Sequence, residues 1–149
     1  MRAALGASGV MLAALAIGCG ATTRNDHDAI EQLWKDYFGA IESGNVGDAA
    51  KLYSSACGDV DGQIETLMNA LAPLQEDGSV DVTGVEIQNN NGTEAESIPL
   101  GTITFRGTQQ EIASDAYTPH VKEDGDWKFS NCDILGGGFF EQTGGGTEQ

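Results

Sequence analysis

The stretch DAIEQLWKDYFGAIESGN, residues 28–45, carries the strongest periodic signal in the chain. Asp28 followed by Glu31 is typical of a capping box at a helix start, and Gly44 is typical of a helix stop. Apolar residues recur between these signals at the spacing of one face of an amphipathic helix: Ile30, Leu33, Trp34, Tyr37, Phe38 and Ile41. We therefore predict a helix that starts at Asp28, with an aromatic stripe that needs an apolar surface to cover it.

Two shorter helices are predicted after this stretch. Asn45 is a suitable cap for the first of them, in which one apolar face repeats: Val46, Ala49, Ala50 and Tyr53. Residues 61–75 form the second, with another stripe at helical spacing: Ile64, Leu67, Met68 and Leu71. This helix is expected to fray near Pro73.

From Val80 the pattern changes to the alternation of strands. The phase shifts at Gly84, as a β-bulge would shift it. The run NNNG at residues 89–92 is a hairpin signal, and a long strand is expected over residues 93–106. Because proline has no N–H to donate, Pro99 predicts an edge position or a bulge.

Two further strands, over residues 109–121 and 127–135, are separated by the turn KEDGD. The four strands are expected to form an antiparallel meander. Helices followed by such a meander indicate an α+β domain, with N-terminal helices packed against a curved antiparallel sheet of about four strands.

The segments LWKDYFGAIESGNVGDAAKLYSSAC and DAYTPHVKEDGDWKFSNCDI resemble the NTF2-like superfamily, also called SnoaL-like or cystatin-like cones. The resemblance covers most of residues 28–135. It implies a pocket between the concave sheet face and the helices, used within the superfamily for catalysis and for binding. Its expected lining is the following set: Trp34, Tyr37, Phe38, Asp61, Phe105, Asp115, Tyr117 and Trp127.

The resemblance to ketosteroid isomerases within this superfamily suggests one catalytic pair. Tyr37 aligns with their oxyanion-stabilising tyrosine, and Asp61 falls near their general base. A carboxylate base and a phenol donor in one apolar pocket would move a proton beside a carbonyl. No counterpart of the second oxyanion donor is present, because Tyr117 and Thr118 stand there. The alternative favours Tyr37 as a core aromatic and Asp61 as a helix cap.

The N-terminus predicts export. Residues 3–18 carry no charge and follow Arg2, but they are too few to span a bilayer, which is typical of a signal peptide. The end of this run, LAIGC, resembles a bacterial lipobox with cleavage before Cys19, although Ala16 stands where leucine is commonest. We expect residues 1–18 to be a signal peptide, Cys19 to be lipidated and residues 19–27 to be a tether. A plain secretory signal is the alternative.

Cys57 and Cys132 are the two remaining cysteines. An oxidising compartment allows them to form a disulfide, which the sequence predicts. Two buried free thiols are the alternative, and zinc ligands at suitable spacing are missing.

The composition excludes several classes of function. Lys and Arg number 7 against 23 Asp and Glu, for a formal net charge of −16, and the cations are scattered, so a nucleic-acid partner is not expected. Anionic lipids would repel this surface, and attachment to a membrane must be covalent or apolar. Phosphate-loop and dinucleotide motifs are missing, and no cofactor or metal is expected. His27 in the tether and His120 near a turn are both expected to be solvated.

Together these patterns predict a lipid-anchored binding or accessory domain on the extracytoplasmic face of the cell membrane, without catalysis. Its partner would be a small apolar ligand or an envelope protein, and the domain would be a monomer or a homodimer. The alternative is an isomerase- or cyclase-like enzyme that uses Tyr37 and Asp61. Residues 136–149, which include Phe139 and Phe140, are expected to be a glycine-rich flexible tail.

Overall fold

The computed structural model describes residues 19–112 and 114–135, so the predicted signal peptide and glycine-rich tail lie outside the described residues. The helices are α1 (Cys19–Glu42), α2 (Val46–Ala50), a 3-10 turn (Ser55–Cys57), α3 (Asp61–Ala70) and α4 (Ala72–Asp77). The strands are β1 (Gly78–Gln88), β2 (Glu94–Phe105), β3 (Thr108–Glu111), β4 (Thr118–Glu123) and β5 (Asp126–Phe129).

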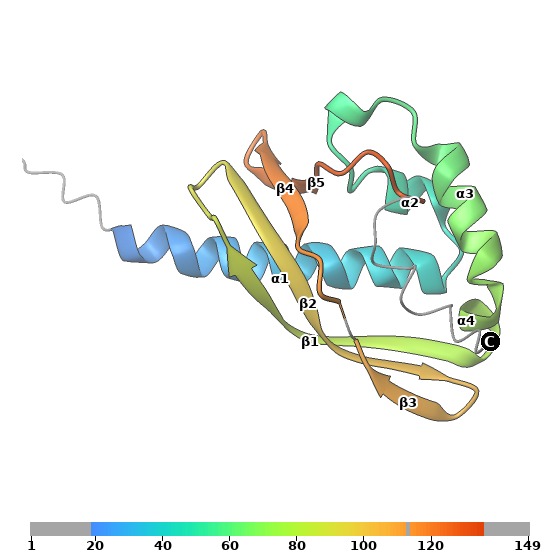
Figure 1. Ribbon diagram of the computed structural model, residues 1–149. Coiled ribbons are helices and arrows are strands. Elements are labelled where there is room, and N and C mark those ends of the chain that lie inside the picture. Colours follow the sequence, from blue (N-terminus) through green and yellow to red (C-terminus); the bar gives the residue numbers. More distant parts are fainter. Residues whose placement is uncertain (1–18, 113, 136–149) are drawn as a thin grey trace, which may run out of the picture.

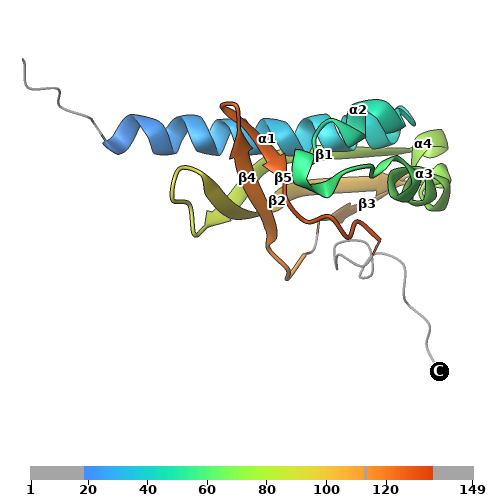
Figure 2. The ribbon, with the colours of Figure 1, turned by 90° about the horizontal axis from the view of Figure 1, so that it is seen from above.

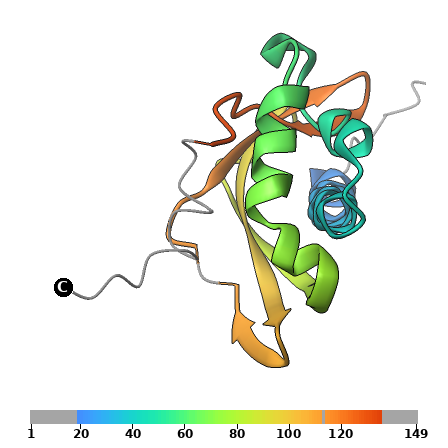
Figure 3. The same ribbon diagram turned by 90° about the vertical axis from the view of Figure 1, so that its right-hand side faces the viewer.

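The strands form one antiparallel sheet in the order β1-β2-β4-β5, with β3 also paired to β2 (Figure 1). Strand β2 is central. It pairs with β1 along its length, with β4 near its start and with β3 near its end. The helices lie together on one side of this curved sheet (Figure 3). The predicted α+β class, with helices on a curved antiparallel sheet, is confirmed.

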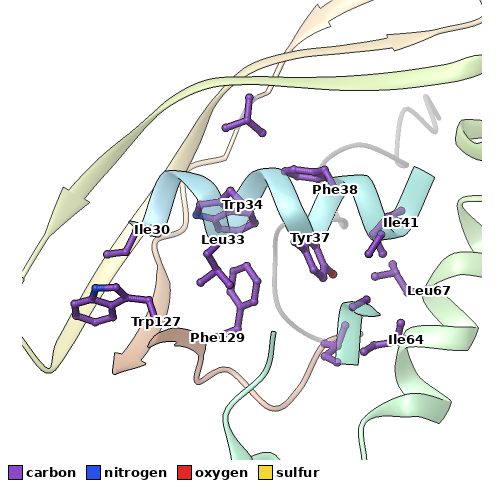
Figure 4. Close-up of a cluster of buried hydrophobic side chains, with 14 of the residues drawn as sticks. Ile30, Leu33, Trp34, Tyr37, Phe38, Ile41, Ile64, Leu67, Trp127 and Phe129 are labelled. Atoms are coloured by element: carbon purple, nitrogen blue, oxygen red, sulfur yellow. The ribbon is translucent and has the colours of Figure 1, made fainter. Parts of the chain in front are cut away.

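The aromatic stripe of α1 is buried against the concave face of the sheet, as predicted (Figure 4). All six apolar residues of the stripe have exposed fractions of 4% or less. However, α1 begins at Cys19, and the predicted start at Asp28 is wrong. Asp28 is exposed within the helix, whereas Asp26 is buried against the sheet, so the preceding turn of α1 belongs to the packed structure.

The third predicted helix is divided at Leu71 into α3 and α4. Pro73 lies in the first turn of α4, where its missing N–H has no intrahelical partner to lose. The proline therefore starts a new short helix, and the predicted fraying there is wrong. Leu74 of α4 packs over Gly78 at the start of β1, where a Cβ would overlap it.

The bulge predicted in β1 is confirmed, because the register with β2 shifts between Val82 and Gly84. Pro99 lies buried in the central strand opposite Val85, and the predicted edge position holds only on its other side, where neither β3 nor β4 pairs with it. Strand β4 pairs with β2 up to Ser97, and β3 pairs from Thr102 onward. Pro99 lies in the interval between them, and its missing N–H interrupts neither ladder.

The single strand predicted over residues 109–121 is two strands. Because β3 and β4 pair with opposite ends of β2, the chain must leave the sheet between them. Two-residue turns at Arg106–Gly107 and Asp124–Gly125 have positive φ at both positions, as tight hairpins require. The last predicted strand is also shorter than expected, since β5 ends at Phe129.

Two glycine substitutions should change stability in opposite directions. Gly101 has a φ of 154°, and a Cβ there would overlap the Asp81 carbonyl oxygen, so Gly101→Ala should lower the free energy of unfolding by at least about 2 kcal/mol. Gly39 lies exposed within α1 with open space around it, so Gly39→Ala should raise it by about 0.5–1 kcal/mol. Urea unfolding of both variants checks this, and equal effects would contradict the packing described at Gly101.

Candidate functional site

The aromatic residues that were expected to line a pocket form the core. Trp34 and Tyr37 pack edge-on against Phe129 of β5, with ring centroids 4.8 Å and 5.1 Å apart. Trp34 also stacks on Phe38 at 5.8 Å. Each of these four rings is at most 3% exposed, and the centre of the concave face is therefore filled by side chains of the protein itself (Figure 4).

The hydroxyl of Tyr37 is hydrogen-bonded to a neighbouring side chain within this core. Tyr53 donates a hydrogen bond to it at an O–O distance of 3.3 Å. Burial raises the pKa of Tyr37 well above its usual value and raises the pKa of Tyr53 to about 12, so both phenols are neutral at physiological pH.

Asp61 lies elsewhere, as the first residue of α3, and is exposed. Its backbone N–H donates to the Asp59 carboxylate at 3.1 Å, which fixes the loop before the helix. The structure therefore places the Tyr37 phenol inside the core and the Asp61 carboxylate on the surface. It does not bring them together as a donor and a base.

Asp115 and Tyr117 belong to the loop before β4. Asp115 is exposed, and the Tyr117 hydroxyl donates a hydrogen bond to the exposed Glu86 of β1. This bond to a carboxylate raises the pKa of Tyr117. Because Glu86 alternates with the buried Val85 along β1, the contact lies on the outer face of the sheet and away from the Tyr37 cluster.

A buried polar chain, which the sequence did not reveal, crosses from α1 to β4. The Trp34 indole N–H donates to Ser97 Oγ at 2.9 Å, and Ser97 Oγ is 2.6 Å from His120 Nε2. With the serine donating to Nε2, the ring proton of His120 is assigned to Nδ1. Nδ1 is buried with no hydrogen-bond partner in the described part of the chain.

His120 was expected to be solvated at a turn, and that expectation is wrong. Its exposed fraction is 2%, and burial lowers its pKa to about 4. The residue pairs with Ala95 and Phe129 in the adjacent strands, which places it on the inner face. Strand alternation would have given this orientation only if the start of β4 had been known, because a shift of one residue reverses it.

A second buried polar group joins α1 to the β4–β5 hairpin. Asp26 Oδ1 accepts hydrogen bonds from Lys122 Nζ at 2.7 Å and from the Trp127 indole at 3.1 Å. Burial opposes the charge on Asp26, but these two bonds and the Lys122 charge outweigh it and lower the pKa of the carboxyl. Trp127, expected in the pocket lining, is thus a buried partner of α1.

The predicted disulfide between Cys57 and Cys132 is present, with an S–S distance of 2.06 Å. It joins the 3-10 turn after α2 to the segment that follows β5. Gln63 reinforces this connection, since its amide donates to the Cys132 carbonyl and accepts from the Ile134 N–H, each at 3.1 Å.

Phe105 is the one expected lining residue that is both apolar and half-buried. It lies two residues beyond Ile103 on the same face of β2, and Ile103 pairs with Val80 of β1. Val80 and Ile103 are half-buried and pack against the edge of the core. We call Val80, Ile103 and Phe105 the concave-end strip. It continues the inner face beyond the α1 aromatics, and the adjacent strand β3 is exposed throughout.

The described segments, residues 19–112 and 114–135, contain neither a metal-ligand cluster nor a membrane-spanning helix. No group of three or more His, Cys, Asp or Glu side chains there is placed to hold a metal ion. The helices described in these segments include none long and apolar enough to cross a membrane.

The low pKa of His120 predicts a stability loss in mild acid. The unfolded chain binds a proton at this histidine near pH 6.5 and the folded chain only near pH 4, so stability should fall as the pH drops between these values. From pH 7.5 to 5 the loss should be about 2 kcal/mol, measured by urea unfolding. Asp26 and Glu123 have lowered carboxyl pKa values, so the stability that their charges contribute is lost mainly below pH 5.

Two histidine variants test whether His120 causes this pH dependence of stability. His120→Gln should flatten the pH dependence between pH 7.5 and 5, whereas His27→Gln should keep it, because His27 is exposed. An unchanged slope in His120→Gln would contradict the assignment.

No protein-family model matches the sequence, and no curated protein matches it as a relative. Solved structures do match. A function-unknown protein of Mycobacterium tuberculosis, Rv3472, is 16% identical with a TM-score of 0.60, over 77% of this chain and 73% of its own. The hexachlorocyclohexane dehydrochlorinase LinA-type3 of Novosphingobium barchaimii is 17% identical with a TM-score of 0.56, over 74% and 85%.

A third matching structure carries the fold name itself. An NTF2-like protein with a cystatin-like fold from Novosphingobium aromaticivorans is 12% identical with a TM-score of 0.52, over 77% of this chain and 86% of its own. At such identities these likenesses concern the fold and leave activity open. The chain has the NTF2-like, cystatin-like fold that its sequence predicts.

Proposed function

We propose that this chain is a lipid-anchored domain on the extracytoplasmic face of the cell membrane, and that it acts by binding an apolar group at the concave-end strip. The group would belong to a small apolar ligand or to an envelope protein. The observation that carries the proposal is the division of the concave face. Its centre is filled by the α1 aromatics, and its end presents half-buried Val80, Ile103 and Phe105.

The extracytoplasmic location is supported by two independent features. The Cys57–Cys132 disulfide suits an oxidising compartment. The uncharged run that follows Arg2 and ends at Cys19 suits export followed by acylation of the cysteine. Removal of residues 1–18 takes away one cation and no acid, so the anchored domain would be more acidic still.

The alternative enzyme would use Tyr37 and Asp61 as a donor and a base. Several proteins of this fold are named as enzymes, among them the dehydrochlorinase above. A base must come within hydrogen-bond reach of the proton that it removes. Asp61 is exposed at the start of α3, and the Tyr37 hydroxyl is buried against Tyr53, so these positions favour binding over this catalytic pair.

Apolar binding at the strip is testable with an uncharged dye such as Nile red. Phe105→Ser should weaken dye binding to the exported chain about tenfold, because loss of an aromatic contact costs on the order of 1.4 kcal/mol. Leu100→Ser is the matched control, since Leu100 lies on the same strand, is 44% exposed and points to the outer face. Fluorescence titration measures both affinities.

Equal weakening in both variants, or in neither, would contradict the proposal. Circular dichroism melting curves check that Phe105→Ser is folded. Native mass spectrometry of the protein recovered from the envelope then identifies the kind of partner. An added small mass that is lost on denaturation indicates a ligand, and a co-purifying chain indicates an envelope protein.

A further inference from the structure

Helix α1 is fastened to one end of the sheet by Asp26. The carboxylate side chain is 5% exposed and forms an ion pair with Lys122 Nζ at 2.7 Å, in addition to its bond from the Trp127 indole. A buried carboxylate that loses its partners is strongly destabilising. The direction of α1 relative to the β4–β5 hairpin is therefore fixed at this point.

The hairpin turns of the sheet lie at the same end. Lys122 lies two residues before the Asp124–Gly125 turn, and its backbone N–H donates to the Thr93 carbonyl at 2.8 Å. The β1–β2 turn therefore lies beside the β4–β5 turn, near the N-terminal half of α1, whereas α3, α4 and β3 lie at the opposite end (Figure 1, Figure 2).

The predicted acylation site is close to this end. Cys19 precedes Asp26 by seven residues, and α1 is continuous between them. At the helical rise of 1.5 Å per residue this is about 10 Å, and even a fully extended segment would reach only about 25 Å. Residues 19–25 of the predicted tether are the first turns of α1, and they form a short helical stem that projects beyond the sheet (Figure 2).

The charges at this end oppose contact with anionic lipid. Asp124, Asp126 and Glu94 are exposed around the two turns. The electrostatic screening length is about 10 Å at 0.1 M salt, similar to the stem, so these carboxylates would be repelled by an anionic bilayer surface. The domain would then be held off the lipid surface at the distance that the stem allows, with the turns facing the bilayer without touching it.

We infer that the α1 stem and the Asp26–Lys122–Trp127 contact hold the domain upright on a lipid bilayer, with the β1–β2 and β4–β5 turns toward the lipid and β3 away from it. This inference rests on the proposed lipid anchor at Cys19. From Glu94 to Ile103, at about 3.3 Å per residue, β2 spans about 30 Å. The concave-end strip is consequently held up to that distance from the turns, where a ligand or envelope protein reaches it without contacting the bilayer.

The orientation is testable by energy transfer to a labelled lipid. The acylated full chain would be reconstituted into phosphatidylcholine vesicles with 20% phosphatidylglycerol and a trace of headgroup-labelled acceptor. A donor dye would be placed on Asp126→Cys at the turn end or on Gln110→Cys in β3, both exposed positions. The other cysteines are occupied by the disulfide and the lipid. Transfer from position 126 should exceed transfer from position 110 at least twofold.

Variants of α1 and of its contact with Lys122 test whether the stem sets this orientation. A fifteen-residue Gly-Ser spacer between Cys19 and Asp26 should abolish the difference without touching the folded sheet. Lys122→Met should also reduce it, whereas Lys35→Met, which removes a solvent-exposed pair with Glu31, should leave it unchanged. If Lys122→Met does not fold, the spacer variant decides.

The outcomes separate the two proposals. A chain without acyl mass on Cys19 would overturn the anchor, and this inference with it. An acylated chain that transfers equally from both positions, or a spacer variant that keeps the difference, would overturn the fixed orientation and leave the anchor standing.

Discussion

The packing of the α1 aromatic stripe on Phe129 is the interaction on which the rest of this structure depends. A curved sheet exposes its concave face unless a helix covers it, and Trp34, Tyr37 and Phe38 supply three large rings at helical spacing for that purpose. The same side chains fill the space that other proteins of this fold are expected to use as a pocket. The proposed binding surface consequently lies toward the end of the sheet, where the aromatics stop and half-buried Ile103 and Phe105 begin.

Buried polar contacts fix how this core is assembled. Ser97 Oγ accepts a hydrogen bond from the Trp34 indole N–H and is hydrogen-bonded to His120, which aligns α1 with β2 and β4. Asp26 fastens the first half of α1 to the β4–β5 hairpin, and the Glu42 carboxylate accepts the Val80 N–H of β1 at the other end. Apolar packing alone would tolerate a rotated or shifted helix. These directional bonds would each be left unsatisfied by such a shift, at a cost of about 1–3 kcal/mol.

Local patterns were sufficient to predict much of this fold. The α1 stripe, the bulge near Gly84 and the tight turns depend on residues close in sequence, and the Cys57–Cys132 pair followed from cysteine number and compartment. The failures involve distant partners. In the sequence Asp26 lies within the predicted tether, and only its contact with Lys122 shows that it belongs to the packed structure. The orientation of His120 depends on where β4 begins. The division of β3 from β4 depends on which end of β2 each strand joins. The concave-end strip was missed except for Phe105, because half-burial is a property of the assembled edge.

Quenching of tryptophan fluorescence tests the filled core most directly, because both tryptophans are buried. Trp34 and Trp127 are the chain's two tryptophans, and they are 2% and 4% exposed. Acrylamide quenching of the native protein should therefore be several-fold weaker than quenching of the urea-unfolded chain, with all of the native emission shielded. A native fraction that is quenched as readily as the unfolded chain would contradict the account, because it would mean that one indole faces an open, water-filled concave site.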